Sequence, residues 1–319
     1  MKTIFGIMSA VHAASTVDQL VHSLRPFDVA IHHDFGQQAD FSITAPNARF
    51  VADPRETGWA VWGFTEGIFH LLRDCLQNSD FEYFQLLSPT CLPIKPVDLF
   101  VGSLSESAFD ANMDVIDLRR DQDALMNYGM RAFAPDGSFR FRILKKCFKY
   151  YYGRDWRPVQ RANLQLRVRA GERRPITESV CEYLVRAGQQ GYLGSSLLTG
   201  ELPPHVGGTW FGAKRDVCEY LVSQYDNPEI QACFSRLYMA DEMMIATLLA
   251  NSDYSIGPTN HLVNRFTEGN PNWLEPDDLG MLQQSESFFA RKFPDDPQAE
   301  IRQAVINMIT KQPVRNSVA

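Results

Sequence analysis

Short apolar runs alternate with stretches of helical periodicity in the N-terminal third of the chain. We expect strands over residues 3–8, 27–32, 49–52 and 83–87. A helix after the first strand would bury Val17, Leu20, Val21 and Leu24, and a longer one would bury Ile68, Leu71, Leu72, Cys75 and Leu76. This alternation predicts an α/β fold with a mostly parallel sheet that is flanked by helices on both faces.

Two features add detail to this pattern. Residues 15–18, Ser-Thr-Val-Asp, resemble a capping box and would start the first helix. Asp34 and Ser88 each follow a predicted strand. Ligands of parallel sheets bind beyond the carboxyl ends of the strands, so both residues are placed where a ligand is expected.

The second half of the chain is less regular at first. Residues 119–174 are rich in Arg, Lys and aromatic side chains, which favours either a solvated, irregular excursion or an insertion that binds an acceptor or a membrane. Helical spacing returns from Thr177, a Gly/Pro-rich loop covers 193–208, and 216–221 and 242–249 are predicted helices. We expect one large domain over 1–297, followed by an amphipathic helix and tail over 298–319.

Composition and charge exclude several classes of protein. The 319 residues are 45% hydrophobic and 22% charged, which is typical of a globular chain with a sizeable core. The net charge of −7 argues against nucleic-acid binding, which requires basic surfaces. No run reaches the roughly 18 apolar residues of a membrane span, and the N-terminal run is too short for a signal peptide. We therefore expect a cytoplasmic protein, with peripheral contact to the inner face of the membrane as a further option.

Cysteines and carboxylates provide little support for a metal site. The six cysteines are scattered without zinc-like spacing, so reduced buried thiols are expected, and disulfides stay open as an alternative. Asp121-Gln122-Asp123 is formally a D-x-D motif, but it follows Leu118-Arg119-Arg120 rather than an apolar strand. A solvated helix start is the interpretation that we prefer, and no metal or other cofactor is expected.

Two short segments in the C-terminal half carry the candidate chemistry. Asp241-Glu242 opens an apolar helix, and a carboxylate there can take a proton from a hydroxyl, although a helix-start carboxylate is also common for electrostatic reasons. Residues 288–293, Phe-Phe-Ala-Arg-Lys-Phe, hold two cations among aromatic residues. Such cations can stabilise a departing phosphate, although Arg291 could instead pair with Asp295, Asp296 or Glu300. Together the segments suggest group transfer from an activated phosphate ester.

Six blocks in order give the chain a resemblance to a known family. They are Ile31-His32-His33-Asp34, Val61-Trp62-Gly63, residues 83–88 with 92–95, residues 207–216, Asp241-Glu242 with 247–249, and 289–293. This order is similar to that of the core-2/I-branching enzyme family of glycosyltransferases, which includes β-1,6-N-acetylglucosaminyltransferases and peptide O-xylosyltransferases. The chain departs from the family at Pro89, Cys91 and Ala240, where the family has Gly, Asp and Pro.

The resemblance implies a single-domain A-type glycosyltransferase-like (Rossmann-like) fold and an inverting, metal-independent transfer of a sugar, N-acetylglucosamine or xylose, from a UDP-sugar to a hydroxyl of a glycan or glycolipid acceptor. It implies that Glu242 is the catalytic base. It also implies donor-binding roles, which fall on Asp34, Trp62, Arg265, Arg291 and Lys292. Residues expected to shape the site are Ser88, Trp210, Phe211, Arg215 and Asp241.

Surface-polysaccharide synthesis is the process that we expect for such an enzyme. Two other classes stay open. The loss of a carboxylate at Cys91 is compatible with a non-catalytic relative that binds a nucleotide sugar or a glycan. The basic and aromatic stretch at 140–157 is compatible with a structural partner in a polysaccharide-assembly complex.

Overall fold

The apolar runs of the N-terminal third form adjacent parallel strands, as their pattern predicts. The computed structural model describes residues 1–121, 202–237, 239–263, 266–267 and 270–311, with short pieces at 139, 142, 156–161, 164–169, 176, 179, 182–183 and 196–199. Within these residues, seven strands form one sheet in the order β12-β6-β11-β4-β1-β2-β3. Their bounds are β1 Thr3–Ser9, β2 Asp28–His33, β3 Ala48–Phe50, β4 Tyr83–Leu87, β6 Ala111–Asn112, β11 Gly212–Lys214 and β12 Ile256–Gly257.

One strand runs against the others in this sheet. β1 pairs in parallel with β2 and β4, and β2 with β3. β11 is antiparallel to both of its neighbours, β4 and β6, while β12 is parallel to β6. The mixed α/β fold with a mostly parallel sheet is therefore confirmed.

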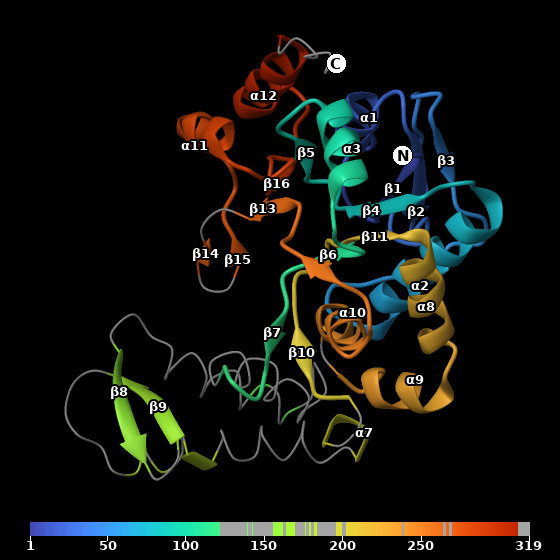
Figure 1. The fold of residues 1–319 in the computed structure, drawn as a ribbon. Coiled ribbons are helices and arrows are strands. Elements are labelled where there is room, and N and C mark those ends of the chain that lie inside the picture. The colour runs from blue at the N-terminus through green and yellow to red at the C-terminus, as the bar shows by residue number, and fades with distance from the viewer. Residues whose placement is uncertain are drawn as a thin grey trace.

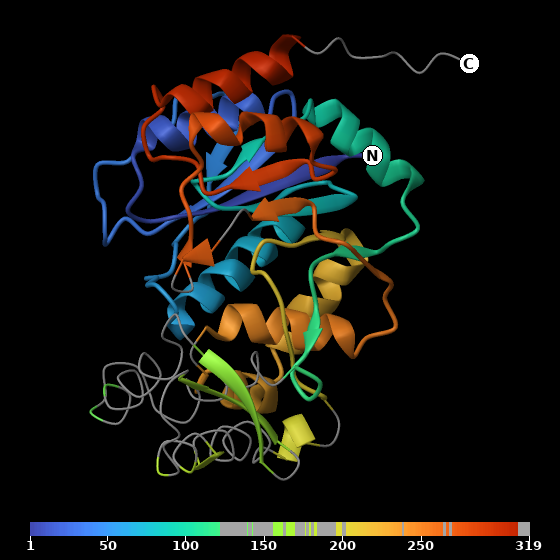
Figure 2. The same ribbon diagram turned by 90° about the vertical axis from the view of Figure 1, so that its left-hand side faces the viewer.

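Helices cover both faces of the sheet (Figures 1 and 2). The first layer holds α2 (Trp62–Asn78), α8 (Arg215–Tyr225) and α10 (Ala240–Ala250), whose buried side chains form one apolar core with the sheet. The second layer holds α1 (Ala14–Ser23), α3 (Val97–Glu106) and α12 (Glu300–Lys311), which enclose another core. Figure 2 shows the sheet between these layers, with α12 and α1 above it and α2 and α10 below.

A small second sheet carries the basic segment, residues 288–293. β16 (Phe289–Arg291) lies between β13 (His261–Val263) and β5 (Leu92–Pro93). Asn260 connects this sheet to the central one, because its side chain donates to Gln85 Oε1 at 2.9 Å and to the Tyr83 hydroxyl at 3.2 Å. Its carbonyl accepts the N–H groups of Phe288 and Phe289. This buried network fixes the start of β16 relative to β4.

The C-terminal helix packs against the start of α1. It buries Ile301 and Val305, as its amphipathic pattern predicts, and also the whole side chain of Arg302. The Arg302 guanidinium donates to Gln19 Oε1 at 2.7 Å and to the carbonyls of Pro294 and Thr16. Burial lowers the pKa of Arg302 to about 10, which leaves it charged at neutral pH.

We expect Arg302→Lys to destabilise the fold by about 2 kcal/mol, because a compact ammonium retains the buried charge but cannot reach three separate acceptors. Urea unfolding measures this difference. Arg120→Lys is the matched control, since the Arg120 side chain is largely exposed, and its effect should be small. Equal stability of Arg302→Lys and wild type would contradict this assignment of Arg302.

Several local expectations are wrong. The first helix begins at Ala14, before the predicted capping box, and Asp18 accepts hydrogen bonds from Thr44 and Ala45 instead. The Ala13 N–H before this helix donates to the Asp295 carboxylate. The predicted loop over 193–208 contains α7 (Ser196–Thr199) and β10 (His205–Val206), and the excursion at 119–174 contains the hairpin β8 (Trp156–Arg161) and β9 (Leu164–Arg169). The segments of β8 and β9 lack the continuous apolar runs that mark β1, β2 and β4.

Four of the six cysteines lie in the described residues. Cys75, Cys91, Cys218 and Cys233 are free thiols, while Cys147 and Cys181 lie outside the described residues. No helix in the described part of the chain is long and apolar enough to cross a membrane.

The remaining elements are β7 Ile116–Asp117, α9 Pro228–Phe234, β14 Phe266–Thr267, β15 Asn270–Pro271, the 3-10 helix Pro276–Asp278 and α11 Leu279–Gln284.

Candidate active site

The acidic pair lies in the first turn of α10. Asp241 is buried and accepts a hydrogen bond from Thr209 Oγ1 at 2.6 Å, and burial raises the pKa of its carboxyl. Glu242 is half-buried, and its carbonyl accepts the Gly207 N–H at 2.9 Å. Of the two carboxylates, Glu242 is therefore the more accessible, and Asp241 serves to join the start of α10 to the segment around Thr209.

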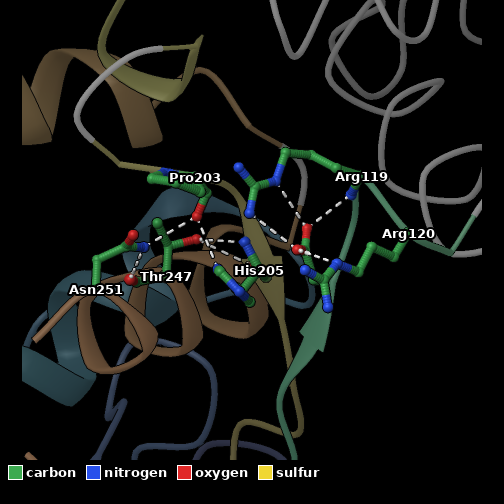
Figure 3. A network of polar contacts seen from close by, with 7 residues as sticks. Arg119, Arg120, Pro203, His205, Thr247 and Asn251 are labelled. Atoms are coloured by element: carbon green, nitrogen blue, oxygen red, sulfur yellow. Dashed lines mark hydrogen bonds and ion pairs between the residues drawn. The ribbon is translucent and has the colours of Figure 1, made fainter.

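A polar network docks β10 onto α10 (Figure 3). The Thr247 hydroxyl donates to the His205 carbonyl and accepts the His205 N–H, both at 3.0 Å. The Pro203 carbonyl accepts from Asn251 Nδ2 at 2.9 Å and contacts His205 Nδ1 at 2.7 Å. On the other side β10 pairs with β7. There Asp117 accepts three hydrogen bonds from Arg119, which hold its pKa at about 2.

The chain leaves β10 through a close approach that only glycine permits. A Cβ at Gly207 would lie 2.0 Å from the Asp114 carbonyl oxygen, whereas nothing lies within 4 Å of one at Gly208. This passage leads directly to Thr209 and Trp210. The docking of β10 and the small size of Gly207 thus set the position of Trp210 relative to Glu242.

Trp210 connects the acidic pair to the basic segment. The Arg291 guanidinium lies over its ring, with Cζ 5.0 Å from the ring centroid, a cation–π geometry. Burial lowers the pKa of Arg291, and the neighbouring Cys91 and Glu242 groups oppose that shift. The charge of Glu242 therefore acts on Arg291, as expected if the two lie on the same side of the sheet. Asp295 instead contacts His12 and the Ala13 N–H, so the structure does not support the alternative in which Arg291 pairs with Asp295.

Lys292 has its own aromatic platform. Its ammonium lies 4.0 Å from the centroid of the Trp273 ring, and the Leu274 N–H donates to the Lys292 carbonyl at 2.8 Å. Burial and the neighbouring Arg291 charge both lower the pKa of Lys292. Two adjacent cations are thus held on two tryptophans. Trp273 was not predicted as a site residue, because its only signal in the sequence is a tryptophan among turn residues. In the structure 45% of its surface is exposed.

Asp34 ties together two loops at the end of β2. Its Oδ1 accepts the Gly36 N–H at 3.0 Å, and its Oδ2 accepts from the Thr57 N–H, the Thr57 hydroxyl and Gln37 Nε2. Burial alone would raise the pKa of this carboxyl, but these hydrogen bonds outweigh it and lower the pKa. From Thr57 the loop reaches Ala60, whose carbonyl accepts the Met239 N–H just before α10. Residues 57–60 therefore link Asp34, at the end of β2, to the start of α10, which carries Glu242.

We expect Asp34→Asn to destabilise the protein by about 1–3 kcal/mol at neutral pH, because an amide NH2 would face donors that the carboxylate now accepts. The pKa of Asp34 is lowered by folding, so its contribution is present above the unfolded pKa and is lost as pH falls through the folded pKa. The difference between wild type and Asp34→Asn should therefore shrink in acid. Urea unfolding at neutral and acidic pH tests this, with exposed Asp40→Asn as the control. A difference that stays constant with pH would contradict it.

The other predicted site residues lie in different surroundings. Trp62 is stacked on Tyr225, with ring centroids 6.0 Å apart, at the start of α2. Ser88 is buried and contacts Thr90 Oγ1 at 2.9 Å and Cys91 Sγ at 3.3 Å. Phe211 is fully buried against Phe84 and belongs to the core below the site.

Arg215 lies away from the acidic and basic segments. It donates to the carbonyls of Ser79 and Leu76, and its own N–H donates to Glu82, just before β4 begins. Ser88 follows the other end of this five-residue strand, which spans about 3.3 Å per residue. β11 is antiparallel to β4. From Trp210 to Arg215 the chain therefore runs away from the edge of the sheet at which β4 ends and ligands are expected. Arg215 therefore connects the start of α8 to the end of α2 and does not shape the candidate site.

Two predicted residues cannot be placed, since Arg265 and Asp123 lie outside the described residues. Asp121 follows β7 and the Asp117–Arg119 cluster, and its N–H donates to the Asp117 carbonyl. Among the residues that the structure describes, no three His, Cys, Asp or Glu side chains are grouped as metal ligands would be.

Comparison with known proteins identifies the family. The model of the Core-2/I-Branching enzyme family matches residues 8–188, more than half of the chain. The match includes Asp34, Trp62 and Ser88, and it ends before Glu242 and the basic segment. No curated protein matches the chain. With its parallel sheet and the matched residues, the chain belongs to the Core-2/I-Branching enzyme family, whose members are glycosyltransferases.

Proposed function

We propose that the protein transfers a sugar from a UDP-sugar to a glycan hydroxyl with inversion and without a metal ion. One observation carries the proposal: Arg291 and Lys292 are adjacent cations held on tryptophans, and Trp210 beneath Arg291 directly follows Thr209, which holds Asp241 in the first turn of α10 beside Glu242. A base for the acceptor and positive charge for the leaving group are thus within one neighbourhood. The family resemblance favours N-acetylglucosamine or xylose as the sugar, and a surface polysaccharide or glycolipid as the acceptor.

The chemistry follows from these roles. The Glu242 carboxylate takes the proton of the acceptor hydroxyl while its oxygen attacks the anomeric carbon. The new carbon–oxygen bond forms as the bond to the diphosphate breaks, and the electron pair leaves on UDP. Lys292 and Arg291 stabilise the growing negative charge, a role that a divalent ion plays in other phosphate-transfer sites.

In the proposal, the uracil of the donor binds at Asp34, which follows the end of β2. A carboxylate has about four lone-pair sites, two on each oxygen. Asp34 Oδ2 already accepts three hydrogen bonds from Thr57 and Gln37, while Oδ1 accepts one. In the proposal, Oδ1 is therefore the atom that accepts from uracil. Trp62 and Arg265 complete the donor site as further proposals.

A ligand panel tests the proposal directly. Ligands that bind only the folded protein raise its melting temperature, by an amount that depends on affinity and concentration. We expect UDP and UDP-sugars to stabilise the protein more than the other nucleotides, and purified protein to transfer or hydrolyse at least one UDP-sugar. Stabilisation without any turnover would support a non-catalytic relative, and stabilisation by no nucleotide would overturn the proposal.

Metal independence has its own test. If fixed cations supply the positive field, then excess EDTA should leave the transfer rate unchanged, and added Mg²⁺ or Mn²⁺ should not raise it. Loss of activity in EDTA, with recovery on adding metal, would contradict this part of the proposal and return attention to Asp121 and Asp123.

A further inference from the structure

Gln85 is a fully buried amide in the middle of β4. Its Nε2 donates to two carbonyl oxygens, that of Leu86 at 3.2 Å and that of Phe211 at 3.0 Å. This orientation turns Oε1 toward the second sheet, where it accepts from Asn260 Nδ2 at 2.9 Å. One side chain of the central sheet therefore holds two segments that are far apart in the sequence.

Each of these two segments carries one half of the cation–π pair at the candidate site. Phe211 directly follows Trp210, and Arg291 Cζ lies 5.0 Å from the centroid of the Trp210 ring. The Asn260 carbonyl accepts two backbone N–H groups at the start of β16, at 3.1 and 3.0 Å, and β16 carries Arg291. The Gln85 amide is thus linked both to the guanidinium and to its aromatic platform.

The surroundings of this amide pair are closely fitted. Asn260 Nδ2 also donates to the Tyr83 hydroxyl at 3.2 Å, which in turn donates to Asn112 Oδ1 at 2.8 Å. Gly212 lies opposite Gln85 on β11, and a Cβ there would lie 2.6 Å from Gln85 Oε1 and 2.2 Å from the Tyr83 hydroxyl oxygen. Only glycine leaves room for the amides at this point, so the fit restricts how far the Asn260 side chain can move.

The position of β16 matters more for phosphate binding than for uracil binding. Hydrogen bonds from Arg291 and Lys292 to phosphate oxygens depend steeply on distance and angle, and a misplacement of about 1 Å can cost an enzyme about 10²-fold in rate. Asp34, by contrast, is held by its own loop and by Thr57. A shift of β16 should therefore change the phosphate end of the site and leave the uracil end intact.

We propose that the amide pair of Gln85 and Asn260 positions β16 and the adjoining Lys292 for a bound diphosphate. Both are positioning residues, which act through the two cations and do not touch the ligand. The inference deepens the proposed function and rests on it for the identity of the diphosphate ligand. Loss of the pair should weaken the contribution of the phosphates to binding and preserve that of the nucleoside.

Asn260→Ala and Gln85→Met each remove one side of the shared hydrogen bond. Calorimetry with inorganic pyrophosphate, UDP and uridine measures the result. We expect each variant to bind pyrophosphate and UDP about tenfold more weakly than wild type, and uridine equally well, because only the cations are displaced. Unchanged affinity for pyrophosphate would overturn the proposal. An equal loss for uridine and UDP would also overturn it, since that is the result of a merely structural role.

The two variants lie on different segments of the chain, so if one of them does not fold, the other decides alone. If neither folds, hydrogen exchange of the wild-type protein decides. The N–H groups of Phe288 and Phe289, which the Asn260 carbonyl accepts, must then be as protected as those of β4. Fast exchange of these two amides would overturn the proposal.

A double-mutant cycle gives the second measurement. Because Gln85 and Asn260 act through one hydrogen bond, the double variant should bind pyrophosphate about as weakly as either single variant. Losses that multiply would contradict a shared link. Asn47→Ala is the matched control, since the Asn47 amide donates to the carbonyls of Phe27 and Val21, away from β16. It should lose stability and keep wild-type affinity for all three ligands.

These results are separable from the proposed function. Wild-type protein that binds UDP but turns over no UDP-sugar contradicts the proposed catalysis, and the comparison of pyrophosphate with uridine still decides the role of the amide pair. Wild-type protein that turns over a UDP-sugar, while Asn260→Ala retains its affinity for pyrophosphate, contradicts the role of the amide pair alone.

Discussion

We expect Glu242→Gln to lower the turnover of sugar transfer by about 10²–10⁴-fold, the usual contribution of a positioned general base. The amide has the same shape as the carboxylate but cannot accept the proton of the acceptor hydroxyl. Glu242 is half-buried in the first turn of α10, and its backbone is fixed by Gly207, so the substitution should not disturb the fold. Steady-state kinetics with the best UDP-sugar from the ligand panel measures the effect, and calorimetry with UDP should show nearly unchanged donor affinity.

Glu219→Gln is the matched control for this experiment. Glu219 is an exposed helical glutamate on α8 that pairs with Arg215, away from the acidic and basic segments. Its amide variant should retain wild-type turnover. A Glu242→Gln enzyme that works at the wild-type rate would remove Glu242 from the role of base.

The second large effect is expected at Lys292. Lys292→Ala should weaken UDP binding by about 10–100-fold, because a charge-assisted hydrogen bond to phosphate contributes about 1.5–3 kcal/mol. Uridine, which has no phosphate, should bind both proteins alike. Calorimetry with the two ligands separates the diphosphate contribution from that of the base.

Lys2→Ala serves as the control, since Lys2 pairs with Asp80 just before β1, at the edge of the sheet opposite Asp34. Its UDP affinity should equal that of wild type. If Lys292→Ala loses affinity for uridine as much as for UDP, the lysine supports the site as a whole and does not act on the diphosphate.

The parts of the fold that sequence could predict are those fixed by local periodicity. β1, β2 and β4 are continuous buried runs, and α2 and α12 have clear apolar faces. β11 has only three residues, and its antiparallel place between β4 and β6 depends on pairing with distant segments. The burial of Arg302 is equally invisible in sequence, because its acceptors come from α1 and from the segment before α12.

In the candidate site, too, the local motifs could be predicted from sequence, and the contacts between them could not. The first turn of α10 and the basic segment are recognisable because each is a compact motif, Asp241-Glu242 and residues 288–293. The contacts that join them come from elsewhere in the chain: Thr209 holds Asp241, and Trp210 lies beneath Arg291. Arg215 follows Trp210 closely in sequence, yet the direction of β11 carries it to the far end of the sheet. Motif spacing alone could not distinguish these two residues.

A crystal structure with UDP bound tests the central claim most directly, because the account requires the base and the cations to face one ligand. We predict diphosphate oxygens within hydrogen-bond distance of Lys292 Nζ, uracil near Asp34 Oδ1, and the Glu242 carboxylate directed toward the open side of the terminal phosphate. UDP bound with its diphosphate remote from Arg291 and Lys292, or on the side of the molecule away from Glu242, would contradict the account.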